Sequence, residues 1–232
     1  MLKEKVYIKY LYHSGFQVEI GDTTLIFDYI KGPVDISNKN TLVFVSHSHP
    51  DHYNKEIFTW QSQNSEIKYI LADEIRPEQP AQNIFSLAPY EEAQLGDVKV
   101  KTFGSTDLGV SFLVQIQQVN IFHAGDFNWW YWYGETPAEI AEAERLFKEE
   151  IVKIKGEMID IALFPVDQRL EHNYCVGADY FIAELKPKYL VPMHFGDCSE
   201  TPQKYAAKMK DSATKVVSLN TPGQSTTISL QK

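Results

Sequence analysis

The stretch VSHSHPDHYN, residues 45–54, places three histidines and an aspartate within the six positions 47–52. It continues directly from the apolar run TLVFV at 41–45, which is typical of a strand covered on both faces. Imidazole and carboxylate groups are the ligands that divalent cations such as Zn²⁺, Mn²⁺ and Fe²⁺ accept. So dense a group at the end of a buried strand predicts a metal site, in preference to a solvated loop that is rich in histidine by chance.

The spacing of these four residues indicates two neighbouring metal positions. In extended backbone, side chains two residues apart point the same way, so His47 and His49 can face one cation. Asp51 and His52 follow Pro50 and can face a second position a few ångströms away. Paired cations about 3.5–4 Å apart hold a water or hydroxide as nucleophile and stabilise the leaving oxygen. The motif therefore predicts a dinuclear site.

The composition is that of one globular domain, expected to span residues 1–232. The 22 basic and 31 acidic residues give a net charge of −9. This charge disfavours nucleic acids and anionic membranes as partners, because both require a basic surface. The sequence has no signal-peptide pattern, no apolar run of about 18 residues, and no CxxC pair. These features predict a cytoplasmic protein without a membrane anchor.

Short apolar runs between turn residues predict strands through most of the first half. We expect strands at 6–11, 16–20, 24–27, 42–45, 67–72, 98–103, 110–116 and 119–122. In the second half, Thr136, Pro137 and Glu139 form a capping-box helix start. Further helices are expected at 177–185 and from 201. The remaining strands are expected at 158–166, 189–193, 214–218 and 226–230.

Four polar residues stand just past the carboxyl ends of these expected strands. They are His47, Asp126, Asp167 and His194. Loops at the strand ends along one edge of a sheet can converge on a shared site. We therefore expect these four side chains to lie near one another.

The segment HSHPDH at 47–52 resembles the signature loop of the metallo-β-lactamase superfamily, and its lactonase-like, metal-dependent hydrolase branch in particular. Four further segments resemble motifs of that branch: YHSGF at 12–16, FD at 27–28, HAGD at 123–126 and PMH at 192–194. The resemblance extends over nearly the whole chain. It implies an α+β fold, a single-domain αββα sandwich of four layers, with a one- or two-metal site at one edge.

The resemblance also implies a set of metal ligands. His47 and His49 would bind the first ion, and Asp126 would bridge both ions. The second ion would be bound by Asp51, His52 and His194. The implied cofactors are two divalent ions per chain, Zn²⁺ or Mn²⁺ with Fe²⁺ as a further candidate, or one ion if the first position is incomplete.

One residue of the superfamily pattern is missing. A third histidine usually completes the first position, but the matching segment, 102–109, contains none. Asp107 is the carboxylate that would replace it, either directly or through water; alternatively, Asp107 caps a tight turn with Gly109. If Asp107 does not ligate, the first position would bind its ion more weakly. Fewer imidazoles and more oxygen ligands would also favour harder ions such as Mn²⁺ over Zn²⁺.

Other residues are candidates for catalysis or substrate binding. His123 is expected beside the substrate or behind the ligands, and Asp51 and Asp126 are expected to be catalytic as well as metal-binding. His13 lies in a loop that the resemblance brings near the site, where a structural role is equally open. The segment after 166 and the aromatic run at 127–134 supply the substrate-binding candidates Asp167, Arg169, His172, Trp129 and Trp130.

The function expected from these residues is hydrolysis by a metal-bound hydroxide. A small-molecule lactone, ester or amide is the expected substrate. Phosphodiester cleavage is the alternative reaction, and a metal-binding or sensor protein without turnover is the alternative class. The aromatic run could instead form a contact between subunits, so a homo-oligomer is a further expectation.

Overall fold

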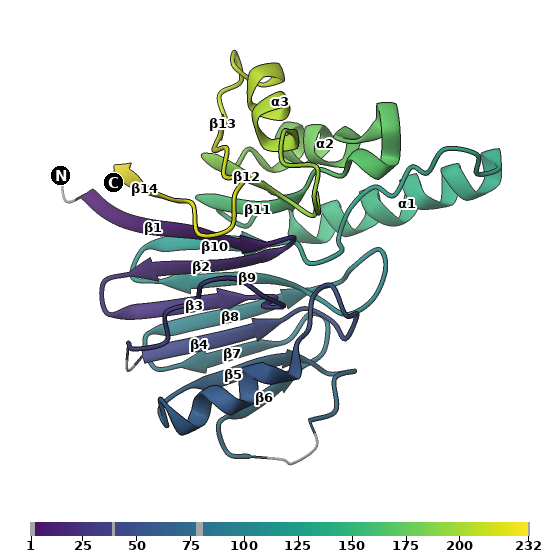
Figure 1. The fold of residues 1–232 in the computed structure, drawn as a ribbon. Coiled ribbons are helices and arrows are strands. Elements are labelled where there is room, and N and C mark those ends of the chain that lie inside the picture. The colour runs from purple at the N-terminus through teal and green to yellow at the C-terminus, as the bar shows by residue number, and fades with distance from the viewer. Residues whose placement is uncertain (1–2, 39, 78–80, 232) are drawn as a thin grey trace.

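The computed structural model describes residues 3–38, 40–77 and 81–231, which form two mixed β-sheets packed face to face (Figure 1). The first sheet has, in spatial order, β14 (Ser225–Gln231), β1 (Lys3–Tyr12), β2 (Gly15–Ile20), β3 (Thr23–Phe27), β4 (Asn40–Val45), β5 (Lys68–Ala72) and β6 (Ile84–Leu87). The second has β13 (Lys215–Val216), β12 (Tyr189–Met193), β11 (Ile161–Pro165), β10 (Val119–His123), β9 (Ser111–Ile116), β8 (Val98–Phe103) and β7 (Glu92–Leu95).

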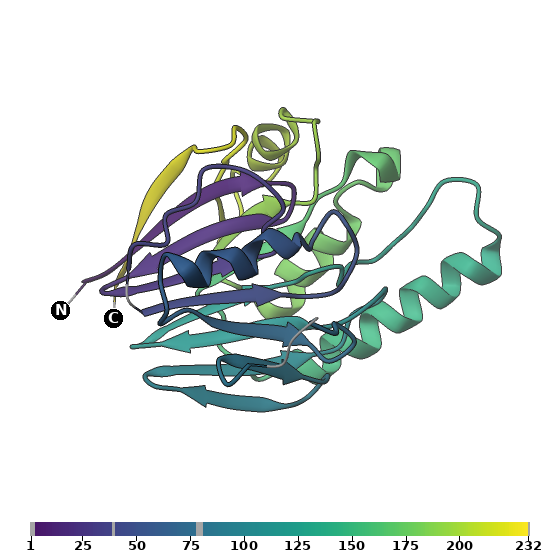
Figure 2. The ribbon, with the colours of Figure 1, turned by 60° about the horizontal axis from the view of Figure 1, so that its bottom comes forward.

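Helices cover the outer faces of both sheets. The short helix η1 (Lys55–Ser62) lies over the first sheet, while α1 (Pro137–Ile154), α2 (Val176–Leu185) and α3 (Thr201–Lys208) lie on the side of the second (Figure 2). The expected helix start is confirmed, because Thr136 and Glu139 form a reciprocal capping box. The four-layer α+β sandwich is therefore confirmed.

Parallel pairing places several strand ends at one edge of the molecule. In the first sheet β3, β4, β5 and β6 pair in parallel, and in the second β10, β11, β12 and β13 do so. The carboxyl ends of these parallel strands therefore lie at one edge of each sheet. His47 follows β4, and Asp126, Asp167 and His194 follow β10, β11 and β12. The expected convergence of these strand ends is confirmed.

Aromatic contacts join the two sheets behind that edge. Phe44 of β4 meets Phe112 of β9 edge-on, with ring centroids 5.3 Å apart. Phe27 of β3 stacks on His123 of β10 at 5.0 Å. All four side chains are fully buried. Close packing of this kind holds the strand ends, and the loops that follow them, in fixed positions.

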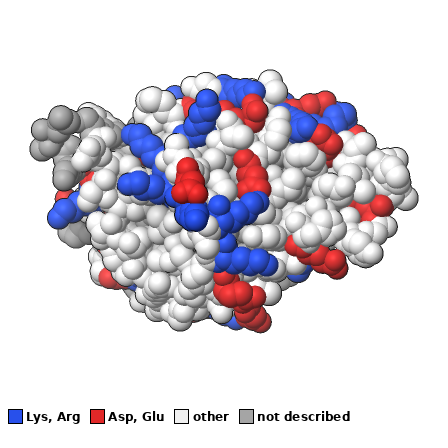
Figure 3. All heavy atoms as spheres, turned by 90° about the horizontal axis from the view of Figure 1, so that it is seen from above, with Lys and Arg blue, Asp and Glu red and all other residues white. Residues whose placement is uncertain are grey.

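Figure 3 shows the molecule from above, on a face where basic and acidic side chains are interspersed. Ion pairs between lysines and acidic residues of the chain include Lys155 with Glu184 at 2.5 Å and Lys188 with Asp160 at 2.8 Å. The face is therefore mixed in charge. Within the described residues, no helix has the length and apolarity needed to cross a bilayer.

Candidate metal centre and cavity

Asp126 lies at the centre of the histidine cluster. Its Oδ1 is 3.0 Å from Nε2 of His52 and 3.1 Å from Nε2 of His194, whereas its Oδ2 is 3.2 Å from Nε2 of His47. The Asp126 side chain is almost fully buried. Its two oxygens thus face different histidines, which is the arrangement that a carboxylate bridging two cations requires.

The atoms of this cluster lack the hydrogen bonds expected of buried polar groups. Despite the short separations, Oδ1 of Asp126 and the Nε2 atoms of His47, His52 and His194 make no well-formed hydrogen bond. More than nine in ten buried polar groups normally have such a partner. Imidazole nitrogens and a carboxylate that converge without satisfying one another fit divalent cations as the missing partners.

The potential ligands fall into two groups, as the sequence motif predicts. One ligand atom each from His47, His49 and Asp126 lies within 4.8 Å of the others. The second group, also within 4.8 Å, comprises His13, Asp51, His52 and His194. The structure therefore brings together all six residues that the family resemblance implies as ligands. It also places His13 beside them, a residue whose role the sequence left open.

Buried carboxylates orient two of the histidines from behind. Asp28 is fully buried, and its Oδ2 accepts a hydrogen bond from Nδ1 of His52 at 2.7 Å. Asp167 accepts one from Nδ1 of His194 at 2.9 Å. A proton held on Nδ1 leaves the Nε2 lone pair directed at the cluster, as metal ligation requires. Asp28 belongs to the FD motif at 27–28, but the sequence did not predict that it orients His52.

The charges of the cluster stabilise one another strongly. Burial alone would lower the pKa of His52, but its contacts with Asp126 and Asp28 raise that pKa to about 10. Burial would likewise raise the pKa of Asp126, but His194, His47 and His52 hold it far below its usual range. The site therefore favours a positive charge beside Asp126, whether from protons or from cations.

A glycine allows the loop between β8 and β9 to approach the first position. Gly109 has φ +73°, and a Cβ there would lie 2.0 Å from the backbone oxygen of Ser46 and 2.6 Å from Cβ of His47. In the same loop, Oδ2 of Asp107 is 3.9 Å from Nδ1 of His49, and its backbone N–H donates to Ser105. Asp107 therefore lies beside His49 but outside the close group of His47, His49 and Asp126, and its side chain makes no capping hydrogen bond to Gly109.

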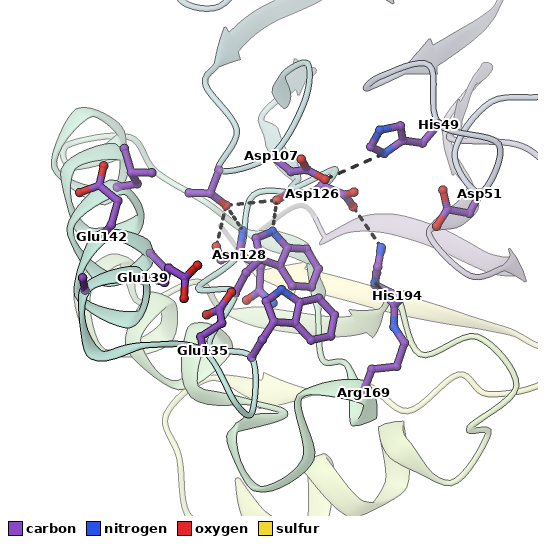
Figure 4. A pocket seen from close by; sticks show the side chains of 16 residues that line it. His49, Asp51, Asp107, Asp126, Asn128, Glu135, Glu139, Glu142, Arg169 and His194 are labelled. Atoms are coloured by element: carbon purple, nitrogen blue, oxygen red, sulfur yellow. Dashed lines mark hydrogen bonds and ion pairs between the residues drawn. The ribbon is translucent and has the colours of Figure 1, made fainter.

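A cavity of about 690 Å³ opens from the cluster towards α1 (Figure 4). Its wall includes Trp130 and Trp132, whose rings stack at 5.7 Å with 7° between their planes. Trp130 donates from Nε1 to the backbone oxygen of Asp126 at 3.0 Å, and its ring meets His194 edge-on. The guanidinium of Arg169 lies 5.6 Å from the Trp132 ring. Both tryptophans and Arg169 therefore line the cavity.

Three of the expected substrate-binding residues lie elsewhere. Trp129 is 9% exposed and packs in the core against Phe147 and Tyr180. His172 is on the surface beside Tyr133. Asp167 is buried beneath His194, which it orients. These three expectations are corrected, and Trp132 takes the place of Trp129, because the chain turns within the aromatic run in a way that no sequence period revealed.

Of the two places expected for His123, the structure supports the one behind the ligands, and its candidacy for catalysis is corrected. Its ring is fully buried, and its Nε2 donates to the backbone oxygen of Ser14 at 2.9 Å. Its Nδ1 accepts from the backbone N–H of Gly125 at 3.2 Å. His123 therefore shapes the turn that presents Asp126 and has no contact with the cavity.

With this geometry established, comparison with known proteins identifies the family. The model of the "Beta-lactamase superfamily domain" matches residues 7–194. The chain belongs to this superfamily. A UPF0173 metal-dependent hydrolase of Nanoarchaeum equitans is 22% identical over 232 residues, covering 92% of this chain and 96% of the relative. A UPF0173 protein of Pyrococcus furiosus is 22% identical over 209 residues, covering 85% and 88%.

A solved structure supports the same assignment of the fold. Igni18, a metallo hydrolase of Ignicoccus hospitalis, aligns with a TM-score of 0.71 over 98% of this chain and 100% of its own. The two sequences are 18% identical. At that identity the likeness establishes the fold alone.

Proposed function

We propose that this chain is a metal-dependent hydrolase that binds two divalent ions and cleaves a small-molecule lactone, ester or amide. The observation that supports this proposal most is that the two carboxylate oxygens of Asp126 face different histidines. Oδ2 faces His47, whereas Oδ1 faces His52 and His194. The Nanoarchaeum relative, a metal-dependent hydrolase, and Igni18, a metallo hydrolase, point to the same class of reaction.

His47, His49 and Asp126 would hold one ion, and Asp51, His52 and His194 would hold the other. When bound, divalent ions at such a centre polarise the bond under attack and activate water at neutral pH. The contact with His13, together with the charge of His52, holds the pKa of Asp51 well below its usual range. Asp51 is therefore a carboxylate at neutral pH, which suits it to ligation and to orienting water.

The shape and charge of the cavity support a small organic substrate. Its volume lies within the 300–1,000 Å³ typical of small-molecule sites. Trp130 and Trp132 offer flat apolar surface for stacking. At the far end the carboxylates of Glu135, Glu139 and Glu142 line the cavity (Figure 4). These carboxylates disfavour phosphodiesters, whose charge they would repel.

The test is a panel of chromogenic lactones, esters, amides and phosphodiesters, assayed with Zn²⁺ or Mn²⁺ added to metal-stripped protein. We expect metal-dependent hydrolysis of at least one neutral substrate and its loss in Asp126→Asn. Asp160→Asn is the matched control, because Asp160 is a buried carboxylate remote from the cavity. Cleavage of phosphodiesters alone would replace the proposal with the alternative reaction. Ion binding without any turnover would favour the sensor.

A further inference from the structure

His13 occupies an unusual position between the hairpin β1–β2 and the end of β12. Its backbone has φ +55°, a left-handed conformation that non-glycine residues adopt in only a few per cent of cases. Its N–H donates to the Tyr10 hydroxyl at 2.8 Å, and its carbonyl accepts from the backbone N–H of His194 at 3.0 Å. The fold thus fixes both backbone groups of His13, and with them the direction of its side chain. Strained conformations of this kind concentrate at functional sites.

The His13 side chain is buried, with the residue 7% exposed, and no hydrogen bond satisfies its Nε2. That atom lies 3.5 Å from Oδ2 of Asp51, and the His13 ring is 4.1 Å from that of His194. Two ligands of one cation, each bound at about 2.1 Å in tetrahedral geometry, stand about 3.4 Å apart. The spacing of His13 and Asp51 is thus that of two ligands sharing an ion.

We propose that His13 is a ligand of the second metal position, joining Asp51, His52 and His194. The second position then has three imidazoles, while the first has two, from His47 and His49. The histidine that the superfamily pattern places at the first position is absent here, and an additional one is present at the second. The proposal rests on the two-ion centre of the proposed function and is independent of hydrolysis.

The order of metal loading follows from this distribution. More imidazole ligands favour tighter binding of borderline ions such as Zn²⁺. The second position should therefore fill first, and limiting metal should give a chain with one ion, held by the group that contains His13. The first position, with Asp107 nearby rather than a third histidine, should fill only at higher metal concentration.

Metal binding to the stripped full-length protein tests this, with Zn²⁺ titrated against a chromophoric chelator and Co²⁺ absorption as a second readout. We expect two binding steps in the wild type. His13→Asn and His13→Gly both tolerate the left-handed backbone. Each should weaken the tighter step by at least about 100-fold, since removal of a mere outer partner already costs 10–100-fold. Both should also alter the Co²⁺ spectrum of the tight site.

His49→Asn is the matched variant of the first position, and it should weaken the second step while preserving the first. His172→Asn, on the surface, should change neither. The proposal is overturned if folded His13 variants keep the tighter step, or if they lose only the weaker one. A wild type that binds two ions in this order but cleaves nothing would refute the hydrolase and leave His13 a ligand. A wild type that binds no ion would refute both.

Discussion

Replacing Asp28 by asparagine should weaken the second metal position without touching a ligand. In the wild type, Oδ1 of Asp28 accepts from the backbone N–H of Ser46 at 2.7 Å. Oδ2 accepts from the Ser46 hydroxyl at 2.6 Å and from Nδ1–H of His52 at 2.7 Å. The carboxylate thus serves three donors, and an amide has only one oxygen with which to do so.

The two orientations of the new amide differ in their consequences. If its NH₂ faces the backbone N–H of Ser46, two donors face each other and that backbone N–H loses its acceptor. A buried donor without an acceptor costs about 1–3 kcal/mol of stability. If the NH₂ faces His52, the imidazole can respond by moving its proton from Nδ1 to Nε2. The second orientation avoids the clash, but it places a proton on the nitrogen that faces Asp126. His52 could then no longer bind a cation through Nε2.

We therefore expect Asp28→Asn to weaken Zn²⁺ binding at the tighter position by about 10–100-fold, the range found for outer partners of metal ligands. This corresponds to about 1.4–2.7 kcal/mol. Competition with a chromophoric chelator measures it directly. Asp160→Asn is again the control, because Asp160 is buried and accepts from the backbone N–H of Asn120 at 2.9 Å, far from the cluster.

The reasoning would be refuted by an Asp28→Asn protein that is folded and binds both ions with wild-type affinity. That result would mean that the tautomer of His52 does not depend on Asp28, or that His52 is no ligand. A loss of affinity in both variants would instead indicate a general effect of removing a buried carboxylate.

Three further predictions concern the surroundings of the site. Gly109→Ala should reduce both thermal stability and first-position metal affinity, measured by melting and chelator competition, because its Cβ would overlap Ser46 and His47. Glu150→Ala should lower the free energy of unfolding by about 1–3 kcal/mol and Tm by roughly 2–10 °C. The reason is that it removes the carboxylate that accepts a hydrogen bond from the backbone N–H of Gly104 at 2.7 Å. For Asp167, contacts with His194 and Arg169 outweigh burial and lower its pKa from 3.8 to about 2. The charged Asp167 should therefore stabilise the metal-free protein by about 2 kcal/mol above pH 4, and this contribution should be lost as the pH falls towards 2. The free energies of unfolding of the wild type and Asp167→Asn, measured by denaturant titration, should therefore converge near pH 2.

Much of the fold could be predicted from local sequence. The apolar runs gave most strands, and the cap at Thr136 gave the start of α1. Strands β6 and β7 were not predicted. Each has only four residues and lies at a sheet edge, where it pairs with a single strand, β5 or β8. The sequence of β7, EAQL, also contains no β-branched or aromatic residue. The 3₁₀ helices η1 and η2 (Gln168–Asn173) were also missed, since such short turns have no apolar period.

For the site too, the residues close together in sequence could be predicted, whereas those positioned by the tertiary fold could not. HSHPDH packs four candidate ligands into one loop, so spacing alone revealed them. Trp130 and Trp132 point into the cavity while Trp129 packs in the core, because Tyr131 N–H bonds back to the carbonyl of Trp129 in a tight turn. A run of consecutive aromatics gives no period from which that turn could be inferred.

His13 shows most clearly what only the tertiary structure supplies. Its approach to His52 and His194 requires the β1–β2 hairpin of one sheet to meet the end of β12 in the other, and a hydrogen bond from His194 to the carbonyl of His13 joins the two. Burying an imidazole nitrogen that makes no hydrogen bond is unfavourable unless another group satisfies it, and Nε2 of His13 is such an atom. The left-handed backbone of His13 adds to that cost. A fold that maintains both of these unfavourable features at one residue is best explained if a bound cation compensates them, which places His13 among the ligands.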